Sequence, residues 1–151
     1  MRGVVSAGMT AALERLGLTQ CFDLVVGASA GAINGAALLA GVAQRGAAAY
    51  SGPLASRSFV DHVLDLAGGL AETGHERVIA SPIALHCIAV DVESAAVVDL
   101  SGMRSKRALW DALLASSRMP WAGGAPVEVD GRLYLGRTGC RARAPRGSAI
   151  A

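Results

Sequence analysis

One segment restricts the fold of this chain more than any other, the stretch CFDLVVGASAGAINGAALLAG at residues 21–41. Its apolar start, residues 22–26, is typical of a buried strand, and residues 29–39 are typical of a helix. The five small residues at 27–31 fit the pattern G-x-S-x-G, in which a serine occupies a tight turn between a strand and a helix. Two interpretations are open: close packing of two elements, or a nucleophile elbow built around Ser29. The flanking strand and helix favour the elbow.

Each residue of the elbow would have a structural role. Gly27 and Gly31 would remove side chains that clash where the strand and the helix cross, and Ala28 and Ala30 are also small. The turn would lift the Ser29 hydroxyl to the carboxyl edge of the sheet. There the N–H groups at the start of the helix would stabilise a developing oxyanion.

The same region raises a membrane-spanning alternative. Leu24–Ala43 is a run of twenty residues without a charge, which is the length that a transmembrane helix needs. Most of these residues are Gly and Ala, however, and Ser29 and Asn34 are polar. The turn signal therefore favours a buried strand followed by a helix.

A serine nucleophile requires a base. The histidines are His62, His75 and His86, and the last 65 residues contain none, so the order serine, acid, histidine of α/β-hydrolases is not available. His86 lies within an apolar strand, which favours a histidine of the core or the sheet face over a catalytic one. A Ser–Asp dyad remains, and its carboxylate must be desolvated to act as a base near neutral pH.

The rest of the chain alternates between helical and strand patterns. We expect helices at 5–16, 59–66 and 106–116, strands at 83–92 and 95–100, and a hairpin at 127–135 that turns at Asp130-Gly131. Residues 46–58 are expected to form a loop or a weak helix, and residues 70–82 an exposed connection. This alternation predicts an α/β domain.

The first expected helix has its apolar residues spaced along one face. They are Val5, Met9, Ala12, Leu13 and Leu16. Glu14 and Arg15 lie off that face, and Gly17 is a suitable stop. This spacing is typical of an amphipathic helix with one apolar side.

Composition limits the choice of partners and of compartment. The formal net charge of +2 gives no strong attraction to nucleic acid, and we expect none as a partner. The three cysteines, Cys21, Cys87 and Cys140, lack paired spacing, which indicates a reducing compartment. No CxxC motif or His/Cys cluster predicts a metal site. Residues 1–20 lack the features of a signal peptide, so we expect a cytoplasmic protein.

Four blocks of the sequence, taken together, carry a family resemblance. They are MRGVVSAGMTAALERLG, FDLVVGASAGAINGAALLAG, LHCIAVDVESAAVVDL and ALLASSRMPWAGGAPVEVDGRLYL. Their order and spacing resemble the patatin-like phospholipase family over nearly the whole of residues 1–135. The resemblance implies a lipid acyl hydrolase with a three-layer α/β/α fold and a Ser–Asp dyad without histidine. It implies a phospholipid or another lipid ester as substrate, peripheral membrane contact, and no cofactor.

By this resemblance Ser29 corresponds to the nucleophile, and Arg2 and Gly3 correspond to the end of the Gly-rich loop that forms the oxyanion hole. In the family that loop lies between the first strand and the first helix. Because the chain begins at Met1, we expect it to lack the first strand and most of the loop, which leaves the sheet incomplete. An upstream start site would restore them.

The family aspartate lies in an Asp-Gly-Gly or Asp-Gly-Ala motif after a late strand, and by spacing it should follow Tyr134-Leu135. The sequence has GRTG at 136–139 instead. The charge balance also breaks here: residues 1–135 have a net charge of −2, whereas residues 136–151 contain four Arg and no acid. We expect residues 1–135 to be the domain and 136–151 an unrelated Arg-rich tail, produced by a reading-frame shift that the nucleotide sequence would reveal.

Two other aspartates are candidates for the base. Asp130 also precedes a glycine, but a hairpin turn explains that pair better than catalysis does. Asp91 ends a buried strand, where capping or a turn is the favoured role. Two functions follow from the sequence: a serine lipid acyl hydrolase of the phospholipase or esterase type, or a catalytically inactive homologue that has become a lipid-binding remnant.

Overall fold

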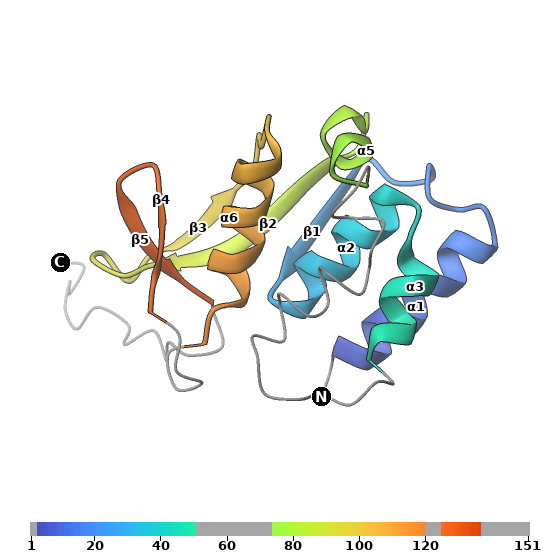
Figure 1. Ribbon diagram of the computed structural model, residues 1–151, viewed down its shortest axis with the longest axis horizontal. Helices are drawn as coiled ribbons and strands as arrows, with labels where there is room; N and C mark the ends of the chain where they lie inside the picture. Colours follow the sequence, from blue (N-terminus) through green and yellow to red (C-terminus); the bar gives the residue numbers. More distant parts are fainter. Residues whose placement is uncertain (1–2, 51–73, 120–124, 137–151) are drawn as a thin grey trace, which may run out of the picture.

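The computed structural model describes residues 3–50, 74–119 and 125–136 (Figure 1). The helices of this part are α1 (Gly3–Arg15), α2 (Ala30–Ala40), α3 (Ala43–Ala49), α5 (His75–Ala80) and α6 (Lys106–Ser117). The strands are β1 (Leu24–Ala28), β2 (Ala84–Asp91), β3 (Val97–Leu100), β4 (Val127–Val129) and β5 (Arg132–Leu135). Helices combined with one mixed sheet of five strands confirm the predicted α/β class.

Strand β2 is the centre of the sheet. It pairs in parallel with β1 and antiparallel with β3 and β5, while β4 pairs with β5. Strand β3 pairs with some of the same β2 residues that pair with β1 or with β5, so it must lie on the opposite edge of β2 from both. Strands β1 and β5 therefore share one edge of β2. Strand β5 therefore runs toward β1, and the carboxyl ends of the two strands approach each other on that edge.

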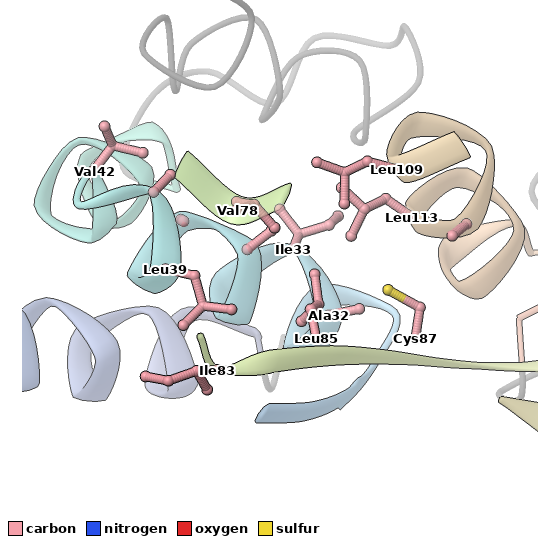
Figure 2. Close-up of a cluster of buried hydrophobic side chains, with 14 residues drawn as sticks. Ala32, Ile33, Leu39, Val42, Val78, Ile83, Leu85, Cys87, Leu109 and Leu113 are labelled. Carbon is pink, nitrogen blue, oxygen red and sulfur yellow. The ribbon is translucent and has the colours of Figure 1, made fainter. Parts of the chain in front are cut away.

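The main core lies between the sheet and the helices α2 and α6 (Figure 2). Nine of the eleven residues of α2 are buried, and most of these are Gly or Ala. This composition brings the helix close to the sheet, since a Cβ on Gly35 would lie 2.6 Å from the Val25 side chain. Among the described residues, the opposite face of the sheet carries exposed apolar side chains, which are Leu24, Val26, Val97 and Leu133. The resemblance implies helices on both faces of the sheet, and among the described residues helices cover one face.

Helix α1 ends where the sequence predicts, since Gly17 adopts a φ of 69° and the Leu18 N–H returns to the Leu13 carbonyl. Its orientation is the opposite of the apolar pattern. Val5, Met9 and Leu16 are 67%, 63% and 70% exposed, whereas Ala7 is buried. The expected apolar face is wrong because the small side of the helix packs against α2 and α3, where its short residues allow a close approach.

Two connecting segments are more ordered than the sequence suggests. Helix α3 begins at Ala43 and ends before the expected Gly52-Pro53 break, which lies outside the described residues. The expected exposed connection at 70–82 contains α5, whose Val78 is buried in the main core. Alanine-rich and mixed sequences such as these have too weak a periodicity to reveal a buried contact. The expected helix at 59–66 lies outside the described residues.

The hairpin, β2 and β3 follow the prediction closely. The strand expected to be buried at 22–26 is instead Leu24–Ala28, and it is mostly exposed because the described helices cover only its other face. Asp130 and Gly131 have φ values of 49° and 78°, the two positive angles that a tight two-residue turn requires. The twenty-residue uncharged run is divided between β1, the eleven-residue helix α2 and the start of α3. In the part of the chain that the structure describes, no helix has the length and hydropathy needed to cross a membrane.

Candidate active site

Ser29 occupies the turn between β1 and α2 with a strained backbone. Its φ is 53° and its ψ is −126°, a region that a residue with a side chain rarely adopts. Gly27 makes this turn possible, because a Cβ there would lie 2.4 Å from the Ala32 nitrogen. Gly31 has no such need, since an added Cβ would meet nothing within 4 Å. The backbone forms the expected turn between a strand and a helix, but in the described part only Gly27 is sterically required, and the expected clash at Gly31 is absent.

The buried Ser116 holds the elbow in place. The Ser29 N–H donates to the Ser116 Oγ at 2.9 Å, and the Ser116 hydroxyl donates to the Ile88 carbonyl at 2.7 Å. Ser116 is fully buried in the last turn of α6, and Ile88 pairs in register with Ala28 at the end of β1. One hydroxyl thus ties the elbow to both α6 and β2. It also occupies the Ser29 N–H.

The carboxyl end of β5 also lies beside Ser116. The Gly136 N–H donates to the Arg118 carbonyl at 2.8 Å. A Cβ on Gly136 would lie 2.6 Å from the Ser116 carbonyl oxygen. The position where the resemblance expects an aspartate is therefore next to the residue that binds the elbow, and a side chain at 136 would require the strand end to shift.

Gly3 lies against the other side of the elbow. A Cβ on Gly3 would lie 2.7 Å from the Ala30 Cβ, so the start of α1 packs directly on the residue after Ser29. Asn34 donates from Nδ2 to the Gly3 carbonyl at 3.0 Å and to the Ser6 Oγ at 2.7 Å. Arg2, the other expected residue of the oxyanion loop, lies outside the described residues.

The candidate bases do not meet the nucleophile in the described part of the chain. No hydrogen bond of these residues reaches the Ser29 Oγ. Asp130 lies in the turn at the amino end of β5, roughly 13 Å of strand from the carboxyl end near the elbow. His86 lies on the sheet face, where its Nδ1 is 2.5 Å from the Asp99 carboxylate.

Asp91 has the capping role that its position suggested. Its Oδ1 accepts hydrogen bonds from the N–H and hydroxyl of Ser94 and from the Glu93 N–H. These bonds, with a smaller contribution from Arg132 at 3.6 Å, lower the pKa of Asp91 below its usual value. A carboxylate so fully engaged in a turn is a poor base.

Among the residues that the structure describes, the cysteines and the other polar clusters add no second reactive centre. Burial and the nearby Asp99 charge raise the pKa of the Cys87 thiol to about 12, so it is not a nucleophile at neutral pH. Cys21 is exposed, and neither Cys21 nor Cys87 is in a disulfide. Within the described ranges, no three His, Cys, Asp or Glu side chains are grouped so that they could bind a metal ion.

Ser29 is held at positive φ between a strand and a helix on an α/β sheet, which is the backbone geometry of the nucleophile elbow in α/β-hydrolases. Comparison with protein families agrees: the model of the patatin-like phospholipases matches residues 1–77, which include α1, the elbow and α2. The chain belongs to the patatin-like phospholipase family, a family of lipid acyl hydrolases. No curated protein matches the chain.

Sequence reasoning missed the residues that support the elbow from behind. Ser116 and Asn34 are both buried polar residues in apolar helices, which is a signal that the sequence contained. A buried polar group needs partners, and here the partners are the backbone of the elbow and of Gly3. The pairing itself depends on contacts between residues 87 and 31 positions apart, which periodicity does not reveal.

Proposed function

We propose that this site is that of a serine acyl hydrolase acting on a lipid ester, with Ser29 as its nucleophile. The observation that carries the proposal is the strained backbone of Ser29, in a turn that requires a glycine at position 27. The Ser29 Oγ would attack the ester carbonyl carbon and pass its proton to a base. The ester C–O bond then breaks, the alcohol leaves with that proton, and water hydrolyses the acyl-enzyme to release the fatty acid and free Ser29. A phospholipid or another lipid ester is the substrate class that the family supplies.

The oxyanion of the tetrahedral intermediate would be held by backbone donors. Because Ser116 occupies the Ser29 N–H, the donors in this proposal are the Ala30 N–H at the start of α2 and the Gly3 N–H at the start of α1. The first N–H groups of a helix have no partner within it and carry its positive dipole end. Arg2 belongs to the same loop in this proposal.

The base is the part of the dyad that the described residues, 3–50, 74–119 and 125–136, do not supply directly. The resemblance places the family aspartate immediately after β5, and the strand end at Gly136 lies beside Ser116. Asp130 is the aspartate that the sequence offers as a substitute, although its positive φ supports a turn role. Residues 1–135 would form one domain, as the pairing of β5 with β2 supports, and the tail from residue 136 would contribute no base.

The second candidate function is a catalytically inactive, lipid-binding homologue. The observation that favours it is the Ser29 Oγ, which no carboxylate contacts among the described residues. Peripheral contact with a membrane suits either function, and it is supported by the exposed residues Val5 and Met9 on α1 and Leu16 directly after it. The unpaired Cys21 and Cys87 support a cytoplasmic setting.

Hydrolysis of a short-chain ester and labelling by a fluorophosphonate separate the two functions. A hydrolase releases product and is labelled, and Ser29→Ala abolishes both; this outcome would refute the inactive homologue. A chain that binds lipid vesicles without either reaction overturns the hydrolase.

Asp130→Asn then tests the base. Asn tolerates the positive φ of the turn, so the variant keeps its stability. We expect its activity to be unchanged, as a turn role requires. A loss of activity at unchanged stability would assign the base to Asp130 instead.

A further inference from the structure

Four polar groups form a buried network behind the elbow. Asn34, which is 2% exposed, donates from Nδ2 to the Gly3 carbonyl at 3.0 Å and to the Ser6 Oγ at 2.7 Å. Its Oδ1 accepts from the Tyr50 hydroxyl at 3.1 Å, and the Ser6 hydroxyl donates to the same Gly3 carbonyl at 3.0 Å. Burial raises the pKa of Tyr50, so its hydroxyl stays protonated and remains a donor.

The network joins the two elements that meet at the nucleophile. Asn34 lies on α2, the helix that begins directly after Ser29, whereas Gly3 begins α1. The start of α1 is in close contact with Ala30, and Tyr50, at the end of α3, lies against Gly3 as well. A buried amide in an apolar helix is costly unless its donors and acceptor are used. Here they are used to fix one carbonyl, that of Gly3.

We propose that Asn34 is a positioning residue that holds the Gly3 end of the oxyanion loop against the start of the nucleophile helix. This inference rests on the proposed function, because it assigns the fixed peptide to the oxyanion hole. Asn34 does not touch the reacting atoms. It orients the Gly3 peptide by holding its carbonyl, so that the N–H groups of α1 and α2 keep one relative geometry. Such preorganised donors contribute more to the rate than donors that must be ordered during reaction.

Asn34→Asp tests the donor role with little change in shape. The carboxylate can still accept from Tyr50, but it presents an acceptor to the Gly3 carbonyl in place of the Nδ2 donor. Ser6→Ala is a milder variant, since it removes the second donor to Gly3 and one acceptor of Asn34 but leaves the direct bond from Asn34 to the Gly3 carbonyl. Tyr50→Phe is the matched control, because it removes a hydrogen bond to the Asn34 acceptor and leaves both bonds to Gly3.

The first measurement is hydrogen exchange of the full chain, which does not depend on any activity. We expect Asn34→Asp to increase exchange at the second turn of α1, whose N–H groups donate to the carbonyls of the first turn, at least tenfold relative to α6. The increase should be smaller in Ser6→Ala and smallest in Tyr50→Phe. Equal exchange of that turn in all four proteins would overturn the proposal. If Asn34→Asp does not fold, the order of Ser6→Ala and Tyr50→Phe decides.

The second measurement is inactivation of Ser29 by a fluorophosphonate, with the maximal rate separated from the reagent affinity. We expect Asn34→Asp to lower the maximal rate roughly 10- to 100-fold at unchanged affinity, somewhat less than the loss of an oxyanion-hole donor. A purely structural role would not lower the maximal rate while leaving the reagent affinity unchanged. If exchange increases but the rate does not fall, the role in the oxyanion hole is refuted. If the unmodified chain is not labelled at all, the proposed hydrolase fails and the exchange result still decides whether Asn34 holds Gly3.

Discussion

At the scale of single residues, the geometry of Ser29 depends on the absence of one side chain. A Cβ on Gly27 would enter the first turn of α2 and come within 2.4 Å of the Ala32 nitrogen. The neighbouring Gly31 lies in the same motif but faces open space. The pattern G-x-S-x-G therefore contains two glycines of different importance.

Replacing each glycine by alanine tests this difference. We expect Gly27→Ala to lower the free energy of unfolding by about 2–4 kcal/mol, because backbone atoms cannot move aside. Gly31→Ala, within α2, should be neutral or stabilise the fold by up to about 1 kcal/mol. Urea denaturation of the two variants measures both changes. Equal stabilities would contradict the steric role of Gly27.

The sequence predicted Ser29, its strand and its helix because all lie within twenty residues of one another. It did not predict Ser116 or Asn34, whose partners are distant in the chain. Hydrogen bonds of this kind have no periodicity, and they become visible only when the sheet has brought α1, α2 and α6 together.

At the scale of elements, α6 is linked to the elbow through one of two adjacent buried serines. Ser116 points to the elbow and to β2, whereas Ser117 donates back to the Leu113 carbonyl of its own helix at 2.6 Å. The first bond joins elements, and the second only supplements a bond that the helix already has. The boundaries of α6 were predictable from the sequence, but the different roles of these serines were not.

The two serines give a matched pair of variants. Ser116→Ala should cost about 1–3 kcal/mol of stability, because it leaves the Ser29 N–H and the Ile88 carbonyl without this partner. Ser117→Ala should cost less than about 1 kcal/mol. Denaturant unfolding gives the two values, and fluorophosphonate labelling should slow only in Ser116→Ala. A larger effect at Ser117 would show that the elbow does not depend on α6.

At the scale of the whole molecule, Asp91 connects the end of β2, the turn after it and Arg132 of β5. Its pKa is lowered mainly by the Ser94 N–H and hydroxyl, so its ionised form stabilises the fold. That stabilisation is complete above the usual Asp pKa of about 3.9, and it is lost as the pH falls through the lower value of the folded state.

Acid unfolding measures this contribution. The unmodified chain should lose stability below roughly pH 4, and Asp91→Asn should remove part of that pH dependence. Arg132→Gln is the control, because Arg132 makes the smallest contribution to the shift and is largely exposed. The same pH dependence in Asp91→Asn would place the acid-sensitive groups elsewhere.

The outward face of α1 belongs to the same scale, since it concerns what the molecule meets. If Val5, Met9 and Leu16 contact a lipid surface, Met9→Lys should reduce co-sedimentation with phosphatidylcholine vesicles several-fold at unchanged stability. Arg107→Gln, on the exposed side of α6, is a control that should bind as before. Unchanged vesicle binding by Met9→Lys would remove α1 from the membrane contact. The order of elements predicted the α/β class. It did not predict which side of α1 faces the interior, because the side with small residues, rather than the side with large apolar residues, packs against α2 and α3.

The close packing of α2 has a consequence for how the chain tolerates change over time. In many proteins the positions that resist substitution hold the largest core side chains. Here the helix behind Ser29 is built from Gly and Ala, and Gly35 leaves no space against Val25. A survey of all substitutions would find the least tolerant positions at the smallest residues of this helix. Related chains would keep these residues small, because an added side-chain atom would have no space.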